Sequence, residues 1–271
     1  MHWWQALILG LVEGLTEYLP VSSTGHLVVT QRLLGIGASE AANAYAIAIQ
    51  AGAIVAVLGL YRSRVKQVLL GLAGKDSEGK RLLVSLLLGF LPAAVLGVLF
   101  DEKIERFLFG PWPVVAAWTV GGVLLLVIAP RLRGRPGLDL TSIGPRAALI
   151  IGFAQCAALW PGVSRSLATI LGGLAVGLSV ASAVEFSFLL GLITLGAATA
   201  YKTLGSGREM LDAYGPAAVL IGFGAAWLSA VLSVRWMVAW LNRRSLAIFG
   251  VWRLCVASIV ALLLLGGQLA Y

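Results

Sequence analysis

The sequence predicts an all-α protein that crosses a membrane several times. Of its 271 residues, 59% are hydrophobic and only 12% are charged, whereas soluble proteins carry about 25% charged residues. Apolar runs long enough to span a bilayer recur along the chain, without the alternating ten-residue strands of a membrane barrel. Two further apolar segments are interrupted by proline. We therefore expect one integral membrane domain over residues 1–271, with six transmembrane helices and two re-entrant pairs of broken helices.

The first broken pair lies at the start of the chain. Residues 3–18 and 25–35 are each shorter than the roughly 20 residues that a span needs, and Pro20 cannot continue a helix between them. A second broken pair covers residues 143–160 and 165–177. The six predicted spans are roughly 43–61, 82–100, 113–130, 183–201, 216–240 and 246–268.

The two broken pairs repeat one another at a spacing of 142 residues. The aligned elements are residues 6–10 with 148–152, Val21-Ser22 with Val163-Ser164, and Gly35 with Gly177. Each half of the chain, roughly residues 1–130 and 143–268, then holds one re-entrant pair and three spans. Because three is an odd number, the second half is predicted to be inverted relative to the first. Broken helices of such inverted repeats meet near the bilayer midplane.

The charges of the loops predict the orientation. Twelve lysines and arginines fall on one side, in residues 62–81 and 131–146 and at Arg243-Arg244, against four on the other side. Cytoplasmic loops carry such an excess, so both termini are expected outside, where the first re-entrant pair enters and the site opens. The net charge of +8 has the same explanation, and no nucleic-acid partner is implied.

The fourteen residues from Glu13 to His26 concentrate polar groups between apolar runs. Glu13 and Glu17 lie on one helix face, a turn apart. Two carboxylates that close repel unless a cation or a shared proton lies between them. Intramembrane ionisable groups are functional by default, so we interpret this pair as part of a site.

Three hydroxyl residues, Ser22, Ser23 and Thr24, follow Pro20. They are good N-cap residues for a helix that runs on from His26, and the free N–H groups of such a helix suit an anion such as phosphate. Capping explains one hydroxyl well and three poorly. His26, one turn beyond the serines, is either a core histidine or a general acid or base.

Arg165 occupies the second break, within Ser164-Arg165-Ser166. A buried arginine needs an anion, and either the glutamate pair or a substrate phosphate could serve, because guanidinium forms bidentate bonds to both. Three other intramembrane polar groups have structural pairing with one another as their simplest role: Gln50, Glu185 and Arg253.

The two polar segments resemble the signature motifs of the bacterial undecaprenyl-diphosphate phosphatase family, the one linked to bacitracin resistance. They read Glu13-Gly-Leu-Thr-Glu17-Tyr-Leu-Pro-Val-Ser22-Ser23-Thr-Gly-His26 and Pro161-Gly-Val-Ser164-Arg165-Ser166. The resemblance extends over the whole chain in length, span count and motif spacing. It implies a multi-pass enzyme of the bacterial inner membrane, a phosphoric anhydride hydrolase that removes the terminal phosphate of undecaprenyl diphosphate. It also implies help from a divalent cation, recycling of the lipid carrier of cell-wall synthesis, and bacitracin resistance.

The resemblance and the residues together suggest phosphoryl transfer at a site open to the periplasm. Magnesium or calcium would be held by Glu13 and Glu17, and Arg165 would neutralise charge on the transferred group. Ser23 would attack the terminal phosphorus while Glu17 or His26 takes its proton; direct attack by water fits the sequence equally well. The residues expected to bind the diphosphate are Ser22, Thr24, Ser164, Arg165 and Ser166.

A secondary transporter or lipid flippase is the alternative. Inverted repeats and broken helices are typical of transporters, in which the glutamate pair would bind a proton or an ion. A hydroxyl cluster beside an arginine-bearing break suits phosphate chemistry better. In either case the polyprenyl tail would lie in apolar grooves open to the bilayer, and a homodimer is left open.

Overall fold

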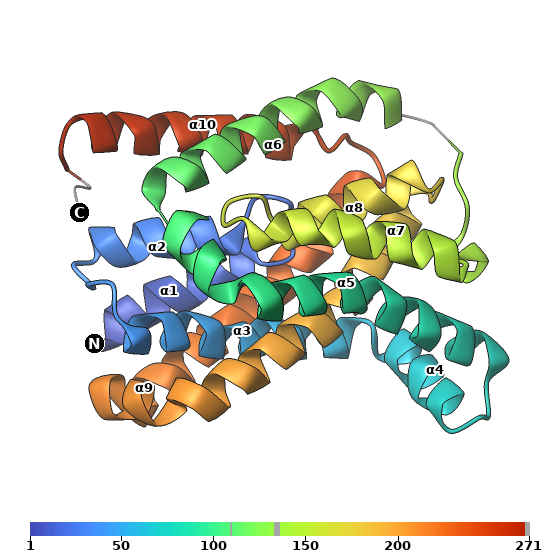
Figure 1. The fold of residues 1–271 in the computed structure, drawn as a ribbon, viewed down its shortest axis with the longest axis horizontal. Helices are drawn as coiled ribbons and strands as arrows, with labels where there is room; N and C mark the ends of the chain where they lie inside the picture. Colours follow the sequence, from blue (N-terminus) through green and yellow to red (C-terminus); the bar gives the residue numbers. More distant parts are fainter. Residues whose placement is uncertain (109, 133–135, 269–271) are drawn as a thin grey trace.

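A computed structural model describes residues 1–108, 110–132 and 136–268, and over these ranges the chain is largely helical (Figure 1). Two arginines counted in the loop charges, Arg133 and Arg135, lie outside them. The helices are α1 (Trp3–Thr16), α2 (Ser23–Leu33), α3 (Glu40–Leu60), α4 (Arg62–Leu72), α5 (Ser77–Leu108), α6 (Pro111–Leu132), α7 (Pro145–Cys156), α8 (Arg165–Ala175), α9 (Val180–Leu241) and α10 (Ala247–Leu265), with short 3-10 turns at Leu140–Ser142 and Ala157–Leu159.

Five of the described helices, α3, α5, α6, α9 and α10, are long and apolar enough to cross a membrane. The prediction of an all-helical, polytopic membrane protein is therefore confirmed. Figure 1 shows α6 and α10 side by side along one edge, with the N-terminus and the C-terminal end of α10 at the same end of the molecule and α4 at the opposite end.

The helix α9 contains two of the predicted spans, 183–201 and 216–240. It has 62 residues, but its backbone is not helical at Gly215, where φ is 75°, and Pro216 follows. Glycine adopts a positive φ without a steric cost, and proline has no N–H with which to continue the hydrogen bonding of the preceding helix. The chain therefore changes direction at this point.

Contacts with α3 show that the two segments of α9 run in opposite directions. In the first segment, Glu185 forms an ion pair with α4, just beyond the end of α3, and Lys202 pairs with Glu40 at the start of α3. In the second segment, the carbonyl of Ala218 accepts a hydrogen bond of 3.0 Å from Tyr45, again near the start of α3. Residues before and after Gly215 thus form an antiparallel pair against one helix.

The charged connection that follows α3 is helical, although its charge suggests a loop. Residues 62–81 are expected to be a loop, but they contain α4 and the first residues of α5. Arginine, lysine, glutamine and leucine are all good helix formers, and a polar helix leaves no signal in hydropathy.

The two broken pairs have matching boundaries. The starts of α1 and α7, at Trp3 and Pro145, are 142 residues apart, and the same spacing separates the starts and the ends of α2 and α8. The spacing read from the sequence therefore describes backbone geometry as well as residue identity.

Small residues place α1 directly against the second segment of α9. A Cβ atom at Gly14 would collide with the carbonyl of Ala226 and the hydroxyl of Ser229. Ser233 in addition donates a hydrogen bond of 2.8 Å to the carbonyl of Gly14. Close helix approach over small residues, with serine bonds across it, is typical of membrane interiors. This contact fixes the part of α1 that carries Glu13.

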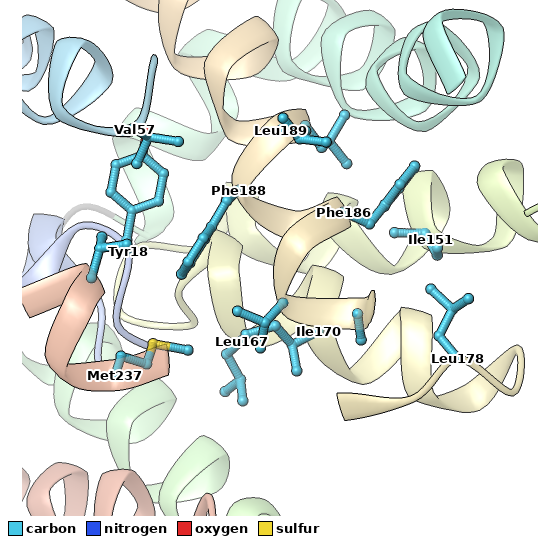
Figure 2. Close-up of a cluster of buried hydrophobic side chains, with 14 of the residues drawn as sticks. Tyr18, Val57, Ile151, Leu167, Ile170, Leu178, Phe186, Phe188, Leu189 and Met237 are labelled. Carbon is cyan, nitrogen blue, oxygen red and sulfur yellow. The ribbon is translucent and has the colours of Figure 1, made fainter. Parts of the chain in front are cut away.

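A buried hydrophobic cluster lies beside the broken helices. Figure 2 shows Tyr18, from the chain between α1 and α2, beside Val57 of α3 and facing Phe188 of α9. The rings of Tyr18 and Phe188 meet edge to face with their centroids 5.2 Å apart. Leu167 and Ile170 of α8 belong to the same cluster. The first segment of α9 is thus the hydrophobic support of both broken pairs.

Candidate active site

Each broken pair turns at a serine with an unusual backbone conformation. Ser22 has a φ of 71° and Ser164 a φ of 78°, and they are the only non-glycine residues with positive φ in the described chain. Each directly precedes a helix, α2 or α8. Such a conformation costs on the order of 1–3 kcal/mol and persists only where the surrounding structure imposes it. We call residues 17–22 the first break and residues 160–164 the second break.

The two breaks are joined by hydrogen bonds. The hydroxyl of Ser166 donates to the carbonyl of Leu19 at 2.8 Å and lies 2.9 Å from the hydroxyl of Ser164. Ser164 also caps α8 by accepting from the N–H of Leu167 at 3.2 Å. Both serines are expected to bind the substrate, and in this structure both hydroxyls are used to hold the breaks together.

Glu17 connects the two breaks chemically. One of its carboxylate oxygens accepts a hydrogen bond from the hydroxyl of Ser23, the first residue of α2. The other oxygen pairs with Nη2 of Arg165 at 3.0 Å. The side chains of Arg165 and Glu17 are only 9% and 4% exposed, so this pair is little screened by solvent. The structure thus brings together three residues expected to be catalytic, from opposite halves of the sequence.

Arg165 is held by three further neighbours. Its Nη1 donates to the carbonyl of Ser187 at 2.9 Å, and its guanidinium lies over the ring of Tyr18, 5.2 Å from the centroid. Gly191 leaves the space that the guanidinium occupies, since a Cβ there would lie 2.7 Å from Cζ. The buried Nε has no hydrogen-bond partner among the described residues. The Nε–H of Arg165 is therefore a donor that a ligand could use.

Glu13 carries the second carboxylate of the glutamate pair. It is fully buried, and neither of its oxygens has a hydrogen-bond partner within the described ranges. A charged carboxylate in that position is costly unless it is paired or binds a cation. Oxygen ligands of this kind suit magnesium and calcium, so the orphaned oxygens fit the expected divalent cation. The described residues contain no cluster of three or more His, Cys, Asp or Glu side chains for a metal. Ligands beyond Glu13 and Glu17 would therefore be backbone, amide or hydroxyl oxygens, substrate or water.

His26 faces away from the serine hydroxyl. Its Nδ1 lies 2.7 Å from the carbonyl of Ser22, and its Nε2 lies 3.0 Å from the indole Nε1 of Trp252. The indole N–H can only donate, so Nε2 accepts and Nδ1 carries the proton that Ser22 accepts. Trp118 meets the ring edge to face at 5.0 Å. Glu17, rather than His26, is therefore placed to take the proton of Ser23, while Thr24 lies half-buried in the first turn of α2.

Several contacts of the site are absent from the sequence prediction. Tyr18 is inside the first motif, but Trp118, Ser187 and Trp252 belong to α6, α9 and α10, and nothing local to them indicates a role. The expected structural pairing of Glu185 with Arg253 is wrong. Glu185 instead pairs with Arg64 at 2.7 Å, because α9 begins where α3 passes into α4.

The fold and the site define a class: a polytopic membrane protein in which a buried carboxylate lies between a serine hydroxyl and an arginine. The family model described as Bacitracin resistance protein BacA matches residues 6–259. The chain belongs to this family.

Curated relatives agree over nearly the whole chain. A protein of Sorangium cellulosum named undecaprenyl-diphosphatase is 45% identical over 264 residues, which cover 96% of this chain and 86% of the relative. Proteins with the same name from Cereibacter sphaeroides and Neisseria gonorrhoeae are 42% and 39% identical and cover 97% and 98% of this chain, and in both cases 97% of the relative.

Proposed function

We propose that this protein is an undecaprenyl-diphosphatase, which hydrolyses undecaprenyl diphosphate to undecaprenyl phosphate and inorganic phosphate. The observation that carries the proposal is the chain of contacts from the Ser23 hydroxyl through the Glu17 carboxylate to the Arg165 guanidinium. It joins a hydroxyl, a carboxylate and a guanidinium at the start of α2 and α8, and we assign to them the roles of nucleophile, proton acceptor and phosphate ligand. The names of the relatives supply the substrate.

The substrate phosphates would lie at the N-termini of α2 and α8, where unpaired N–H groups favour an anion. Arg165 would turn from a carboxylate partner to a phosphate partner, or bind both, because its fork of donors matches either. Stabilising the charge on the transferred group is the main demand of phosphoryl transfer. Ser22 and Thr24 would add donors at the first break, and Ser164 and Ser166 would keep the second break in register with it.

In the serine route, Ser23 Oγ forms a bond to the terminal phosphorus and the bond to the bridging oxygen breaks. The hydroxyl proton passes to Glu17 and from Glu17 to the oxygen of the departing undecaprenyl phosphate, which leaves Glu17 as a carboxylate again. Water then hydrolyses the phosphoserine, with Glu17 as the base for this second step. In the water route, Glu17 takes the proton of an attacking water instead, and Ser23 only holds the phosphate.

Glu13 and Glu17 would hold a divalent cation, magnesium or calcium. When bound, the cation would neutralise charge on the phosphate oxygens. Because both oxygens of Glu17 already have partners, Glu13 is the stronger candidate as the permanent ligand.

Phosphate release by the purified protein in detergent tests the reaction. Wild type should release phosphate from a prenyl diphosphate in the presence of magnesium or calcium. Loss of all release in Ser23→Ala supports the serine route, and release within a few-fold of wild type supports the water route. Folded wild type that releases no phosphate would refute the proposed reaction and favour the lipid flippase, which needs a two-sided membrane to be assayed.

We also propose six spans in an inverted repeat, with the site open to the periplasm. The antiparallel segments of α9 and the shared spacing of the broken helices support this topology, and the excess of basic residues near α4 supports a cytoplasmic position for that end. A membrane-impermeant thiol reagent should label Thr24→Cys from outside the cell. Labelling only from the cytoplasmic side would contradict the orientation.

A further inference from the structure

Arg253 of α10 is completely buried, and its five donors are all used on backbone carbonyls. It takes part in none of the ion pairs found among the described residues. Its hydrogen bonds run from Nε to Trp118 at 3.3 Å, from Nη1 to Pro20 and Val163 at 3.1 Å each, and from Nη2 to Ala117 at 2.9 Å and Gly162 at 2.7 Å.

These five carbonyls come from three places that meet only in the folded protein. Pro20 belongs to the first break, Gly162 and Val163 belong to the second break, and the other two carbonyls belong to α6. One guanidinium therefore ties both breaks to each other and to a helix that crosses beside them. A buried arginine ordinarily pairs with a carboxylate. Arg253 instead donates to backbone carbonyls, three of which belong to the two breaks.

The bonded carbonyls adjoin the strained serines. The carbonyl of Val163 and the N–H of Ser164 share one peptide plane. In a trans peptide these two groups point in opposite directions, and the described chain has no cis peptide bonds. Holding the carbonyl on Arg253 therefore aims the N–H of Ser164 away from Arg253. In the first break the Pro20 carbonyl shares its peptide plane with the N–H of Val21, so Arg253 constrains the peptide just before the one that carries the N–H of Ser22.

The fold makes room for this arrangement at Gly121 of α6. A Cβ atom there would lie 2.7 Å from Cζ and 2.9 Å from Nε of Arg253. The neighbouring Gly122 faces a different part of α10, where a Cβ would lie 2.9 Å from Leu254 and 3.0 Å from the carbonyl of Gly250. Gly121 thus leaves space for the guanidinium of Arg253, whereas Gly122 allows α6 and α10 to pack closely.

We propose that Arg253 is a positioning residue that holds the two breaks in the geometry that binds the diphosphate. The kinetic test of this proposal rests on the proposed function, whereas its test by amide hydrogen exchange does not. Arg253 is not expected to touch the substrate. It also leaves a positive charge without a carboxylate beside both breaks, which favours an anion at the site.

The test uses three variants of the full-length protein in detergent. Arg253→Lys keeps the charge but has three donors instead of five. Gly121→Ala keeps the arginine but displaces its guanidinium, and Gly122→Ala is the matched control for helix packing. For each protein we would measure kcat and KM with a prenyl diphosphate, the apparent Tm, and amide hydrogen exchange in residues 17–26, 160–168 and α3.

We expect Arg253→Lys and Gly121→Ala to lower kcat by about 10–100-fold, since a displacement of about 1 Å at a reacting centre costs about 100-fold, with KM changed less. Exchange should accelerate at both breaks and stay unchanged in α3. Gly122→Ala, whose Cβ would meet Leu254 and the Gly250 carbonyl rather than the guanidinium, should lower kcat and accelerate exchange at the breaks much less than Gly121→Ala does.

Unchanged exchange at the breaks in folded Arg253→Lys would overturn the proposal, and so would faster exchange throughout the chain, which indicates general destabilisation. Should Arg253→Lys fail to fold, Gly121→Ala decides by the same criteria. Failure of both to fold, with folded Gly122→Ala, would also overturn it, because Arg253 would then serve the whole fold. Inactive wild type would refute the proposed function, and the exchange result would still decide the role of Arg253.

Discussion

Replacing Glu17 with glutamine tests the central contact of the site. Each carboxylate oxygen of Glu17 accepts one hydrogen bond, from Ser23 and from Arg165. Glutamine has the same shape but only one acceptor oxygen, and its NH₂ group can only donate. Whichever way the amide lies, either the serine hydroxyl or the guanidinium faces a donor. The substitution therefore removes the base and one side of the ion pair without changing the volume of the site.

Two magnitudes follow from this geometry. Loss of a general base lowers the rate by about 10²–10⁴-fold, which is about 2.7–5.4 kcal/mol in the activation barrier. Removing one partner of a buried ion pair costs about 3–5 kcal/mol in stability. We expect the lower end, because Arg165 keeps the carbonyl of Ser187 and the ring of Tyr18. For a chain of this size about 3 kcal/mol corresponds to a fall of about 6–12 °C in Tm.

Phosphate release and thermal unfolding of Glu17→Gln, each compared with wild type, measure these effects. Glu185→Gln is the matched control, since Glu185 also forms an ion pair with an arginine, at 2.7 Å, but its side chain is 24% exposed, against 4% for Glu17. The control should keep kcat within about threefold, because surface-proximal pairs contribute little. A kcat for Glu17→Gln within about threefold of wild type would refute the assignment of Glu17 as the base.

Three further substitutions test other parts of the site. Glu13→Gln should unfold at or above the wild-type temperature in a chelator, because a neutral amide costs less to bury than an unpaired carboxylate; magnesium or calcium should raise the Tm of wild type but not of this variant, and equal shifts would remove Glu13 as a ligand. Ser22→Gly should keep the wild-type Tm while Ser22→Val loses about 1–2 kcal/mol of stability, since a β-branched residue is strained at a φ of 71°, and equal Tm values would argue against an imposed turn. Trp252→Phe removes the donor to His26 and should lower kcat by less than about tenfold, because one neutral hydrogen bond contributes about 1 kcal/mol; a larger fall would return His26 to the reacting centre.

The presence of several long apolar helices was predictable from the sequence because a bilayer demands apolar helices of a minimum length. The same demand explains the failure at residues 62–72, where a polar helix, α4, lies outside the apolar pattern. The second broken pair was predicted at residues 143–160 and 165–177, and α7 and α8 begin at Pro145 and Arg165. Hydropathy alone could not predict that the two segments of α9 pack antiparallel against α3, since that depends on Gly215 and on contacts far apart in the sequence.

The site was predictable as far as its local pattern extends. Glu17 and Ser23 are six residues apart, and a break between them was sufficient to suggest a meeting. Nothing in the sequence indicates that Ser22 and Ser164 adopt a positive φ, because serine rarely does so. The environment of His26 was equally hidden, since Trp252 is 226 residues away. Long-range packing, which a single sequence does not display, decides which histidine nitrogen donates and which accepts.

The turns at Ser22 and Ser164 have the same backbone conformation but are followed by residues of different chemistry. The same backbone turn occurs at Ser22 and at Ser164, yet the residue that follows is Ser23 in one copy and Arg165 in the other. One copy carries the hydroxyl that we propose as the nucleophile, and the other carries the guanidinium. The proposed site therefore needs both copies, and a chain truncated after either half is expected to be inactive. The residue after each turn can therefore differ between the two copies, provided that the backbone conformation of the turn is kept.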